Sequence, residues 1–187
     1  MGDAATLTID SQALEVTRFW REAGMEKWFP KSDAFDDEFR AKFLDLHFAA
    51  ARREKDHWAE TPEGMLALMI LLDQFPRNCF RNTGHMYATD PLARMFARQA
   101  LADGFDQQIE PPILRLFFYL PLSHSENIED QEIAVRLNMP LGDALKHAVG
   151  HWDIVKRFGR FPHRNPMLGR DTTPEEQAFL DGGGFKG

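Results

Sequence analysis

Residues 147–165 read HAVGHWDIVKRFGRFPHRN, and this stretch favours a helix that ends near residues 158–159 and then turns a corner. The segment FPHRN at 161–165 repeats an earlier segment, FPRN at 75–78, which also follows an apolar helical run. Each copy places a guanidinium and an amide near a helix end. Such groups suit carboxylate or phosphate recognition, and they equally suit capping of a neighbouring helix. The sequence therefore predicts two similar corners.

Helical periodicity continues outward from these corners over most of the chain. Apolar residues recur at spacings of three and four along 11–23 and 33–56, which is typical of helices with one buried face. Capping signals are expected to begin further helices at Thr61, Asp90, Asn127 and Thr173. Pro76 should end the preceding helix near Gln74, because proline disfavours helical backbone at the residue before it. No segment alternates with period two, so we predict an all-α protein of about eight helices in antiparallel pairs.

Length and composition indicate one well-packed domain. A chain of 187 residues fits a single domain, and its 16 Phe and 4 Trp supply large rings for a well-defined core. We expect Phe75 and Phe161 to be buried where each corner turns. Three consecutive glycines at 182–184 interrupt the helical pattern. We therefore predict a single helical domain over residues 1–180, followed by a flexible tail over 181–187.

Composition also narrows the classes of partner. The net charge of −7 argues against nucleic-acid and anionic-membrane binding, and the longest apolar runs, at 65–72 and 113–122, fall short of the roughly 20 residues that cross a bilayer. The opening residues MGDAATLTID lack the basic end and apolar run of a secretion signal. A single cysteine, Cys79, excludes an internal disulfide. We expect a cytoplasmic protein with no nucleic-acid or membrane partner, and the sequence leaves its oligomeric state open.

Four segments of the chain resemble a known bacterial family. They read LLDQFPRNCFR at 71–81, ATDPLA at 88–93, FFYLPLSHSENIEDQE at 117–132 and RFGRFPHRNPMLGRDTTPEEQAFL at 157–180. In these segments the chain resembles members of the bacterial domain-of-unknown-function family 924. The resemblance implies a right-handed array of helix pairs similar to tetratricopeptide repeats. It implies no reaction, and it transfers no catalytic residues.

A local excess of positive charge surrounds the second corner. Residues 150–170 carry five Lys or Arg residues against Asp153 alone, a net charge of +4. The planar fork of arginine matches carboxylate and phosphate oxygens two at a time, which makes an anion-binding site one interpretation. Its candidate residues come from both corners: Arg77, Asn78, Arg157, Arg160, His163, Arg164 and Asn165. In the alternative interpretation each Arg-Asn unit pins its own corner, and nearby acids neutralise the basic residues.

Histidines and carboxylates offer a second candidate site. General acid–base chemistry would draw on four side chains: Asp73, His124, Glu126 and His151. His147 and His151 share a helical face at the spacing of metal-binding helices, but Ala148 stands where zinc proteases carry glutamate. We therefore expect no metal and no cofactor. Asp73 interrupts the end of an apolar helix, and a buried carboxylate without a partner is costly, so pairing with an arginine is its simpler role.

The favoured hypothesis is an array protein that binds an anionic small molecule or an acidic peptide at a polar groove near the Arg-Asn corners. Helix-pair arrays present concave surfaces where residues distant in sequence gather. One alternative is a hydrolase that uses the histidine and carboxylate residues named above. Another is a protein-interaction scaffold in which both corners are purely structural. The sequence leaves open whether the chain is an enzyme.

Overall fold

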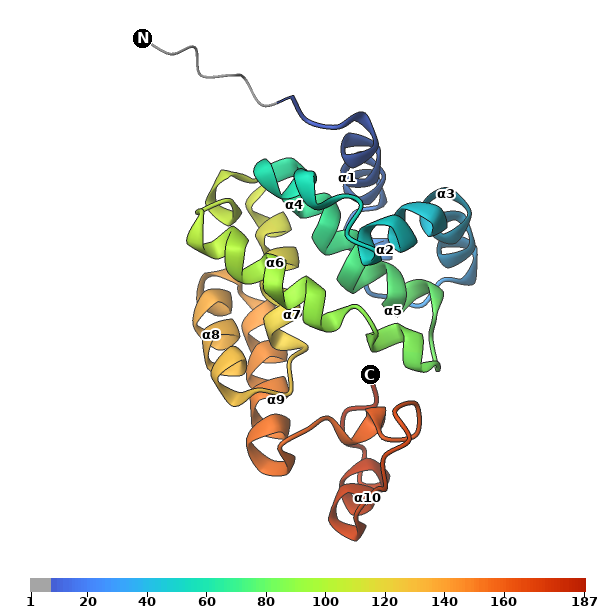
Figure 1. The fold of residues 1–187 in the computed structure, drawn as a ribbon. Helices are drawn as coiled ribbons and strands as arrows, with labels where there is room; N and C mark the ends of the chain where they lie inside the picture. Colours follow the sequence, from blue (N-terminus) through green and yellow to red (C-terminus); the bar gives the residue numbers. More distant parts are fainter. Residues whose placement is uncertain (1–7) are drawn as a thin grey trace. The chain divides into compact units, whose positions relative to one another are not determined.

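The structure, a computed structural model, describes residues 8–187, and every regular element in this range is helical (Figure 1). The prediction of an all-α fold is confirmed for these residues, while the tetratricopeptide-like stacking stays a prediction. Residues 1–7 belong to the opening segment from which we expect no secretion signal, and they lie outside the described residues. Within the described part of the chain, no helix combines the length and the apolar character needed to cross a bilayer.

The chain forms two compact units. The first contains the chain up to residue 81 together with residues 85–121, and the second contains residues 82–84 and 122–187. Helix α7 (Leu116–Ser123) begins in the first unit and ends in the second. The single domain expected over 1–180 stays a prediction, because compact packing alone does not show which segments fold independently.

The first unit surrounds a buried central stretch. Its helices are α1 (Ser11–Ala23), α2 (Met25–Trp28), α3 (Asp33–Ala51), α4 (Pro62–Met69), α5 (Phe75–Cys79) and α6 (Asp90–Ala102). Short 3-10 turns lie at Asp56–Glu60, Gly84–Tyr87, Asp106–Gln108 and Pro112–Arg115. Helix α4 packs against α1 and α6, and α5 packs against α3. Every residue from 64 to 76 is buried, so this stretch forms the centre of the unit.

Local capping signals explain where several helices begin. Five N-cap side chains accept a backbone N–H of the first helical turn: Asp10, Ser32, Thr61, Asn127 and Thr173. Helix α6 differs from the expectation, because Thr89 and not Asp90 occupies its N-cap position. The Thr89 side chain makes no cap hydrogen bond, and Asp90 lies inside the helix. The capping pattern therefore predicts the start of α6 to within one residue, but it wrongly assigns Asp90 as the N-cap residue.

The helix before the first corner does not end near Gln74, so that prediction is wrong. Helix α4 continues through a π-helical turn (Ile70–Gln74) directly into α5. Phe75 keeps helical backbone angles ahead of Pro76, with φ −52° and ψ −48°. A proline ring in an α-helix clashes with the carbonyl four residues earlier, and the wider π turn accommodates it.

Pro76 has no N–H, so it cannot donate a backbone hydrogen bond to a carbonyl group of the preceding turn. Side chains from elsewhere in the first unit replace that donor. Nδ1 of His47 lies 2.9 Å from the Leu71 carbonyl oxygen. The Thr89 hydroxyl donates to the Leu72 carbonyl oxygen at 2.6 Å. Tertiary contacts therefore satisfy the backbone that the proline disrupts.

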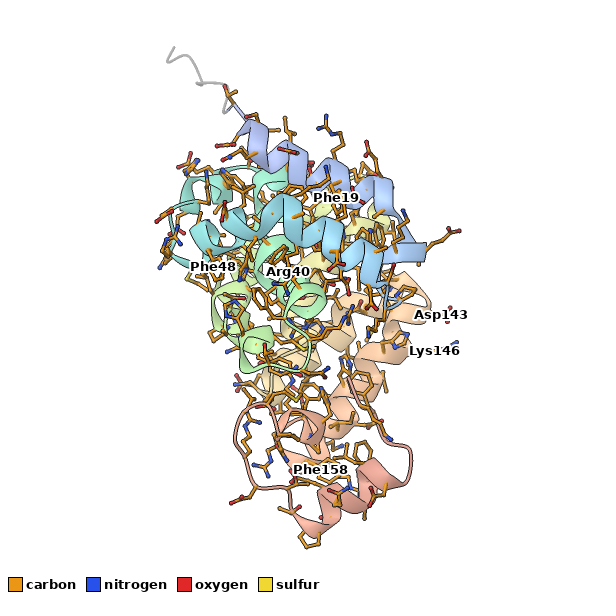
Figure 2. The ribbon with its side chains drawn as sticks, turned by 90° about the vertical axis from the view of Figure 1, so that its right-hand side faces the viewer. Phe19, Arg40, Phe48, Asp143, Lys146 and Phe158 are labelled. Atoms are coloured by element: carbon orange, nitrogen blue, oxygen red, sulfur yellow. The ribbon has the colours of Figure 1, made fainter. Side chains whose placement is uncertain are left out.

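Aromatic rings fill the space between α1, α3 and α5. Phe19 of α1 lies against α3 (Figure 2), with its ring centroid 5.4 Å from those of Phe35 and Phe39. Phe39 in turn meets Phe75 of α5 edge-on at 4.9 Å. Such stacked and edge-to-face pairs stabilise a core beyond the burial of their area. Phe75 is fully buried, which confirms the prediction for the first corner.

The second unit centres on a helix pair. Its helices are α8 (Ile128–Asn138), α9 (Asp143–Phe158) and α10 (Pro174–Asp181), with 3-10 turns at Met139–Leu141 and Pro162–Arg164. Helix α8 packs along α9, and α10 packs against the turn at the second corner. Gly159 ends α9 in the left-handed conformation, at φ 69°, which its missing Cβ permits. The chain then leaves the helix before it reaches Phe161.

A small apolar cluster holds this unit together. It consists of three buried residues and two partly buried phenylalanines: Ile154, Val155, Phe161, Phe158 and Phe179. Phe161 is only 1% exposed, which confirms its predicted burial. On the solvent side of α9, Asp143 and Lys146 form an exposed ion pair with an N–O distance of 2.8 Å (Figure 2). Exposed pairs contribute little to stability, so the buried side of α9 matters more.

Candidate functional site

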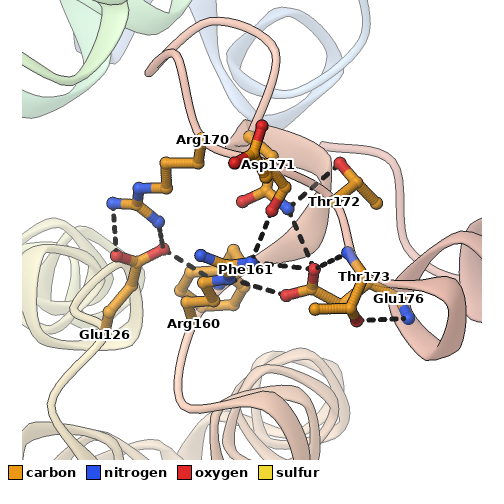
Figure 3. A network of polar contacts seen from close by, with 9 residues as sticks. Glu126, Arg160, Phe161, Arg170, Asp171, Thr172, Thr173 and Glu176 are labelled. Atoms are coloured by element: carbon orange, nitrogen blue, oxygen red, sulfur yellow. Dashed lines mark hydrogen bonds and ion pairs between the residues drawn. The ribbon is translucent and has the colours of Figure 1, made fainter.

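Carboxylates neutralise much of the positive charge at the second corner (Figure 3). Arg160 binds Glu176 through Nε and Nη2, at 2.6 and 2.9 Å, and its Nη2 also donates to the Asp171 carbonyl oxygen at 2.8 Å. Arg157 contacts Glu175 at 3.0 Å on the exposed surface. Bidentate arginine–carboxylate pairs are strong because two charge-assisted hydrogen bonds form together. Arg160 therefore pins the corner to the start of α10, as the structural interpretation predicts.

Glu176 is the centre of this polar network. It completes a capping box, because it accepts the Thr173 backbone N–H at 2.8 Å and donates its own N–H to the Thr173 hydroxyl at 3.2 Å. Nδ2 of the buried Asn165 donates to Oε2 of Glu176 at 3.2 Å. The pKa of Glu176 is lowered to about 2, chiefly by the hydrogen bond from Arg160. Glu176 is therefore ionised at neutral pH and holds the first turn of α10.

Glu126 makes a second, partly buried ion pair at the corner. Its carboxylate oxygens accept hydrogen bonds from Nη1 and Nη2 of Arg170, at 2.8 and 2.7 Å. The Phe161 backbone N–H donates to the same carboxylate at 2.9 Å. Burial alone would raise the pKa of Glu126, but these hydrogen bonds and the nearby Arg164 charge hold it below its ordinary value. A carboxylate kept ionised in this way does not suit the role of a general acid.

Three side chains of the second unit lie around the Phe161 ring, and His124 lies beside one of them. We call these four the histidine cluster: His124, His151, His163 and Arg164. The His151 ring centroid lies 5.4 Å from that of Phe161 and 6.1 Å from that of His124. The His163 ring centroid lies 5.7 Å from that of Phe161. The buried guanidinium of Arg164 lies 4.4 Å from the centroid of the same ring, and its Nη2 donates to the His124 carbonyl oxygen at 2.9 Å.

His151 carries a buried nitrogen whose hydrogen-bonding capacity is unmet. Its Nδ1 has no hydrogen-bond partner among the described residues. The pKa of His151 is lowered to about 3, first by burial and then by electrostatic repulsion from neighbouring groups that include Arg164. The imidazole is therefore neutral at pH 7, and Arg164 is the permanent cation among the groups that act most strongly on it. A ring N–H in these surroundings can donate a hydrogen bond to an anion.

The first corner commits its arginine to carboxylates. Nη1 and Nη2 of Arg77 donate to the two Asp90 oxygens at 2.9 and 3.0 Å, and Nη1 lies 3.0 Å from Oδ1 of Asp73. Burial alone would lower the pKa of Arg77, but the charges of Asp73 and Asp90 raise it above its ordinary value. Asn78 donates to the Asp36 carboxylate at 2.7 Å. Asp73 is thus an arginine partner, which is the simpler of its two expected roles.

The structure divides the predicted site residues between the two units. The second unit holds the histidine cluster together with four other candidates: Glu126, Arg157, Arg160 and Asn165. The first unit holds the remaining three: Asp73, Arg77 and Asn78. Across residues 8–187, no group of three or more His, Cys, Asp or Glu is placed to hold a metal ion. Most of the predicted site residues therefore belong to the second unit, which also holds the histidine cluster.

Sequence reasoning misses two residues of this region. Glu176 is visible as the third helical residue of a capping box, but no local pattern links it to Arg160. Phe185 follows three glycines and gives no sequence signal. Its ring centroid nevertheless lies 4.9 Å from that of His151 and 5.1 Å from that of His163. Only the folded chain shows that this ring belongs to the surroundings of the histidine cluster.

The chain is similar to known proteins over nearly all of its length. The model of a family described as "Bacterial protein of unknown function (DUF924)" matches residues 16–184. A solved structure of a protein of unknown function from Agrobacterium tumefaciens shares 59% sequence identity, with a TM-score of 0.89. That match covers 91% of this chain and 97% of the other. No curated protein shows significant similarity to the chain.

Proposed function

The chain belongs to the bacterial DUF924 family, and we propose that it binds an anionic small molecule at the histidine cluster of its second unit. The observation that carries this proposal is the buried Nδ1 of His151, which lacks a hydrogen-bond partner among the described residues. A buried polar atom without a partner costs free energy, and a ligand that supplies an acceptor recovers it.

The charge of Arg164 near His151 favours an anion over a neutral ligand or a cation. Arg164 is buried, and its charge is among the influences that lower the pKa of His151 after burial itself. Electrostatic attraction to an anion is stronger in such partly desolvated surroundings than in water. A neutral imidazole with its proton on Nδ1 would donate to a phosphate or carboxylate oxygen, and the Arg164 guanidinium would offset the charge of the ligand.

The contacts of the carboxylates favour binding over hydrolysis. A hydrolase based on His151 would use a carboxylate to orient the imidazole and to stabilise its charged form. Glu126 instead accepts hydrogen bonds from Arg170, and no carboxylate is among the groups that act most strongly on His151. Asp73 belongs to the other unit, where it pairs with Arg77. A neutral histidine near the buried guanidinium of Arg164 suits recognition of an anion.

Isothermal titration with inorganic phosphate tests the proposal. His151→Phe keeps an aromatic ring beside Phe161 and removes both ring nitrogens. We expect it to weaken phosphate binding by about tenfold or more, because a hydrogen bond to a charged group contributes on the order of 1.5–3 kcal/mol. His57→Phe is the matched control: it makes the same substitution at an exposed position of the first unit. We expect this control to change the affinity by less than about twofold.

Thermal unfolding in phosphate gives an independent measurement. A site of millimolar affinity adds about 2.7 kcal/mol to the stability of the folded state at 100 mM ligand. General exclusion of phosphate from the protein surface would stabilise the wild type and His151→Phe equally. Equal stabilisation of the two proteins, together with no saturable heat of binding, contradicts the proposal.

A further inference from the structure

The segment after α10 is directed by its glycines towards the histidine cluster. The backbone N–H groups of Gly182 and Gly184 donate to the Ala178 and Phe179 carbonyl oxygens, at 3.0 and 2.9 Å. Gly183 adopts φ +86°, a conformation that L side chains rarely adopt. A Cβ at Gly184 would lie 2.6 Å from the ring and the carbonyl oxygen of Phe179, so this turn has no room for a side chain. The turn sets the direction of the segment that carries Phe185.

Phe185 occupies a position between two imidazoles of the cluster. Its ring meets that of His151 at 4.9 Å and that of His163 at 5.1 Å, both edge-on. The side of His163 is covered further by the chain at Gly187, where a Cβ would lie 3.1 Å from Cδ2 of the ring. Phe185 is still 40% exposed, so its ring is only partly buried by these contacts. The cluster thus offers an aromatic surface near the Arg164 guanidinium, and a segment of the same chain covers it.

We propose that the ligand of the histidine cluster is an aromatic anion, a phosphate or carboxylate joined to a ring, whose ring displaces Phe185 from His151 and His163. This inference rests on the proposed anion site and specifies its ligand. The anionic group lies towards Nδ1 of His151 and the Arg164 charge, and the ring takes the edge-on contacts that Phe185 now makes. Phe185 competes with the ligand, because a site that is covered for part of the time binds with a correspondingly lower apparent affinity.

Two probes separate the anionic and the aromatic contributions: inorganic phosphate and phenyl phosphate. In Phe185→Ala we expect phenyl phosphate to bind about three- to tenfold more tightly than it binds the wild type, because its ring no longer competes with Phe185. We expect the affinity for inorganic phosphate to change by less than about twofold. Phe29→Ala is the matched control, since it removes a similarly exposed phenylalanine, 49% exposed, from the first unit. It should leave both affinities unchanged.

Gly184→Ala provides a second variant that keeps the Phe185 ring. Its new Cβ displaces the turn from Phe179, so the ring leaves the cluster, and phenyl phosphate should again bind more tightly than to the wild type. If neither probe binds the wild type or Phe185→Ala, the proposed function itself fails. If inorganic phosphate binds in a His151-dependent way, but phenyl phosphate gains nothing in Phe185→Ala and Gly184→Ala, only the inference about the aromatic ligand is overturned.

Discussion

The two corners of this protein share a short sequence, Phe-Pro followed by Arg-Asn, and yet they adopt different backbones. At the first corner Phe75 remains helical, and the chain continues through Pro76 as helix. At the second corner Phe161 is extended, with φ −91° and ψ 106°, because Gly159 has already ended the helix. The extended form is the usual preference of a residue before proline. The first corner departs from that preference because a π turn and buried side-chain donors compensate for the proline.

The arginines of the two corners differ in the same way. Arg77 is held by two buried carboxylates, Asp73 and Asp90. Arg164 donates to a backbone carbonyl oxygen and lies over the Phe161 ring, close to histidines. The first corner is therefore a structural joint, whereas the second places a buried cation beside groups that can meet a ligand. A repeated motif does not imply a repeated role.

Truncation of the phenylalanines at the two corners has the largest expected effect on stability. Phe75→Ala and Phe161→Ala each remove a fully packed ring, and we expect each to lower the free energy of unfolding by about 3–5 kcal/mol. Urea denaturation followed by circular dichroism measures both. Phe29→Ala, at an exposed position, serves as a control and should cost less than about 1 kcal/mol. An unchanged midpoint for Phe161→Ala contradicts the view that this ring holds the second unit together.

Replacement of the two arginines should show how the corners differ in the stability that each guanidinium contributes. Arg77→Met leaves Asp73 and Asp90 buried without their cation, and we expect it to cost about 3 kcal/mol or more. Arg164→Met removes, among its contacts, a hydrogen bond to a carbonyl oxygen and a cation–ring contact, and we expect a cost of at least about 1 kcal/mol. The same urea denaturation measures both variants. Equal costs for the two would mean that Arg164 is as tightly bound into a carboxylate network as Arg77.

Protonation of His47 at acidic pH should lower the stability of the fold at the first corner. Burial lowers the pKa of His47 from its ordinary value of 6.5 to about 4. As the pH falls, His47 is therefore protonated in the unfolded chain before it is protonated in the folded protein. The stability that neutral His47 contributes is complete above pH 6.5 and is lost as the pH falls towards 4. The loss is on the order of 2–3 kcal/mol, because each pKa unit corresponds to about 1.4 kcal/mol. Stability measured against pH should show this decline, and His47→Gln should flatten it.

An NMR titration distinguishes His47 from a general effect of acid. The His47 imidazole should stay neutral down to about pH 4, since burial disfavours its charged form and its Nε2 lies 2.9 Å from Nε2 of His85. If His47 titrates near 6.5 in the folded protein, the proposed contribution to acid lability is absent.

The smallest expected effect concerns the proline of the first corner. Thr89→Val leaves the Leu72 carbonyl oxygen without its donor, and we expect a cost of about 1–2 kcal/mol. In a Pro76→Ala background the new N–H of residue 76 can donate to that carbonyl, so the same substitution should cost about 1 kcal/mol less. A double-mutant cycle measures this coupling. Pro162→Ala is the matched control at the second corner, and its effect should simply add to that of Thr89→Val.

The sequence by itself determines the helical class, several helix starts and the burial of both corner phenylalanines. The relevant interactions are local. Helical periodicity places apolar residues three and four apart on one face, and caps such as Thr61 and Thr173 act within a single turn. The left-handed end at Gly159 is similarly a property of one residue. Such features depend on neighbours in the chain, which a sequence displays directly.

Only the tertiary structure decides how the corners work, because their partners are distant in sequence. Arg77 meets Asp90 across 13 positions, and Arg170 meets Glu126 across 44. Packing in the first unit supplies the donors that let Pro76 lie inside a helix, against the preference of its own dipeptide. Burial likewise determines that His151 is neutral with an unmet nitrogen. Charge pairing and desolvation depend on which atoms the fold brings together, and spacing along the chain does not specify that.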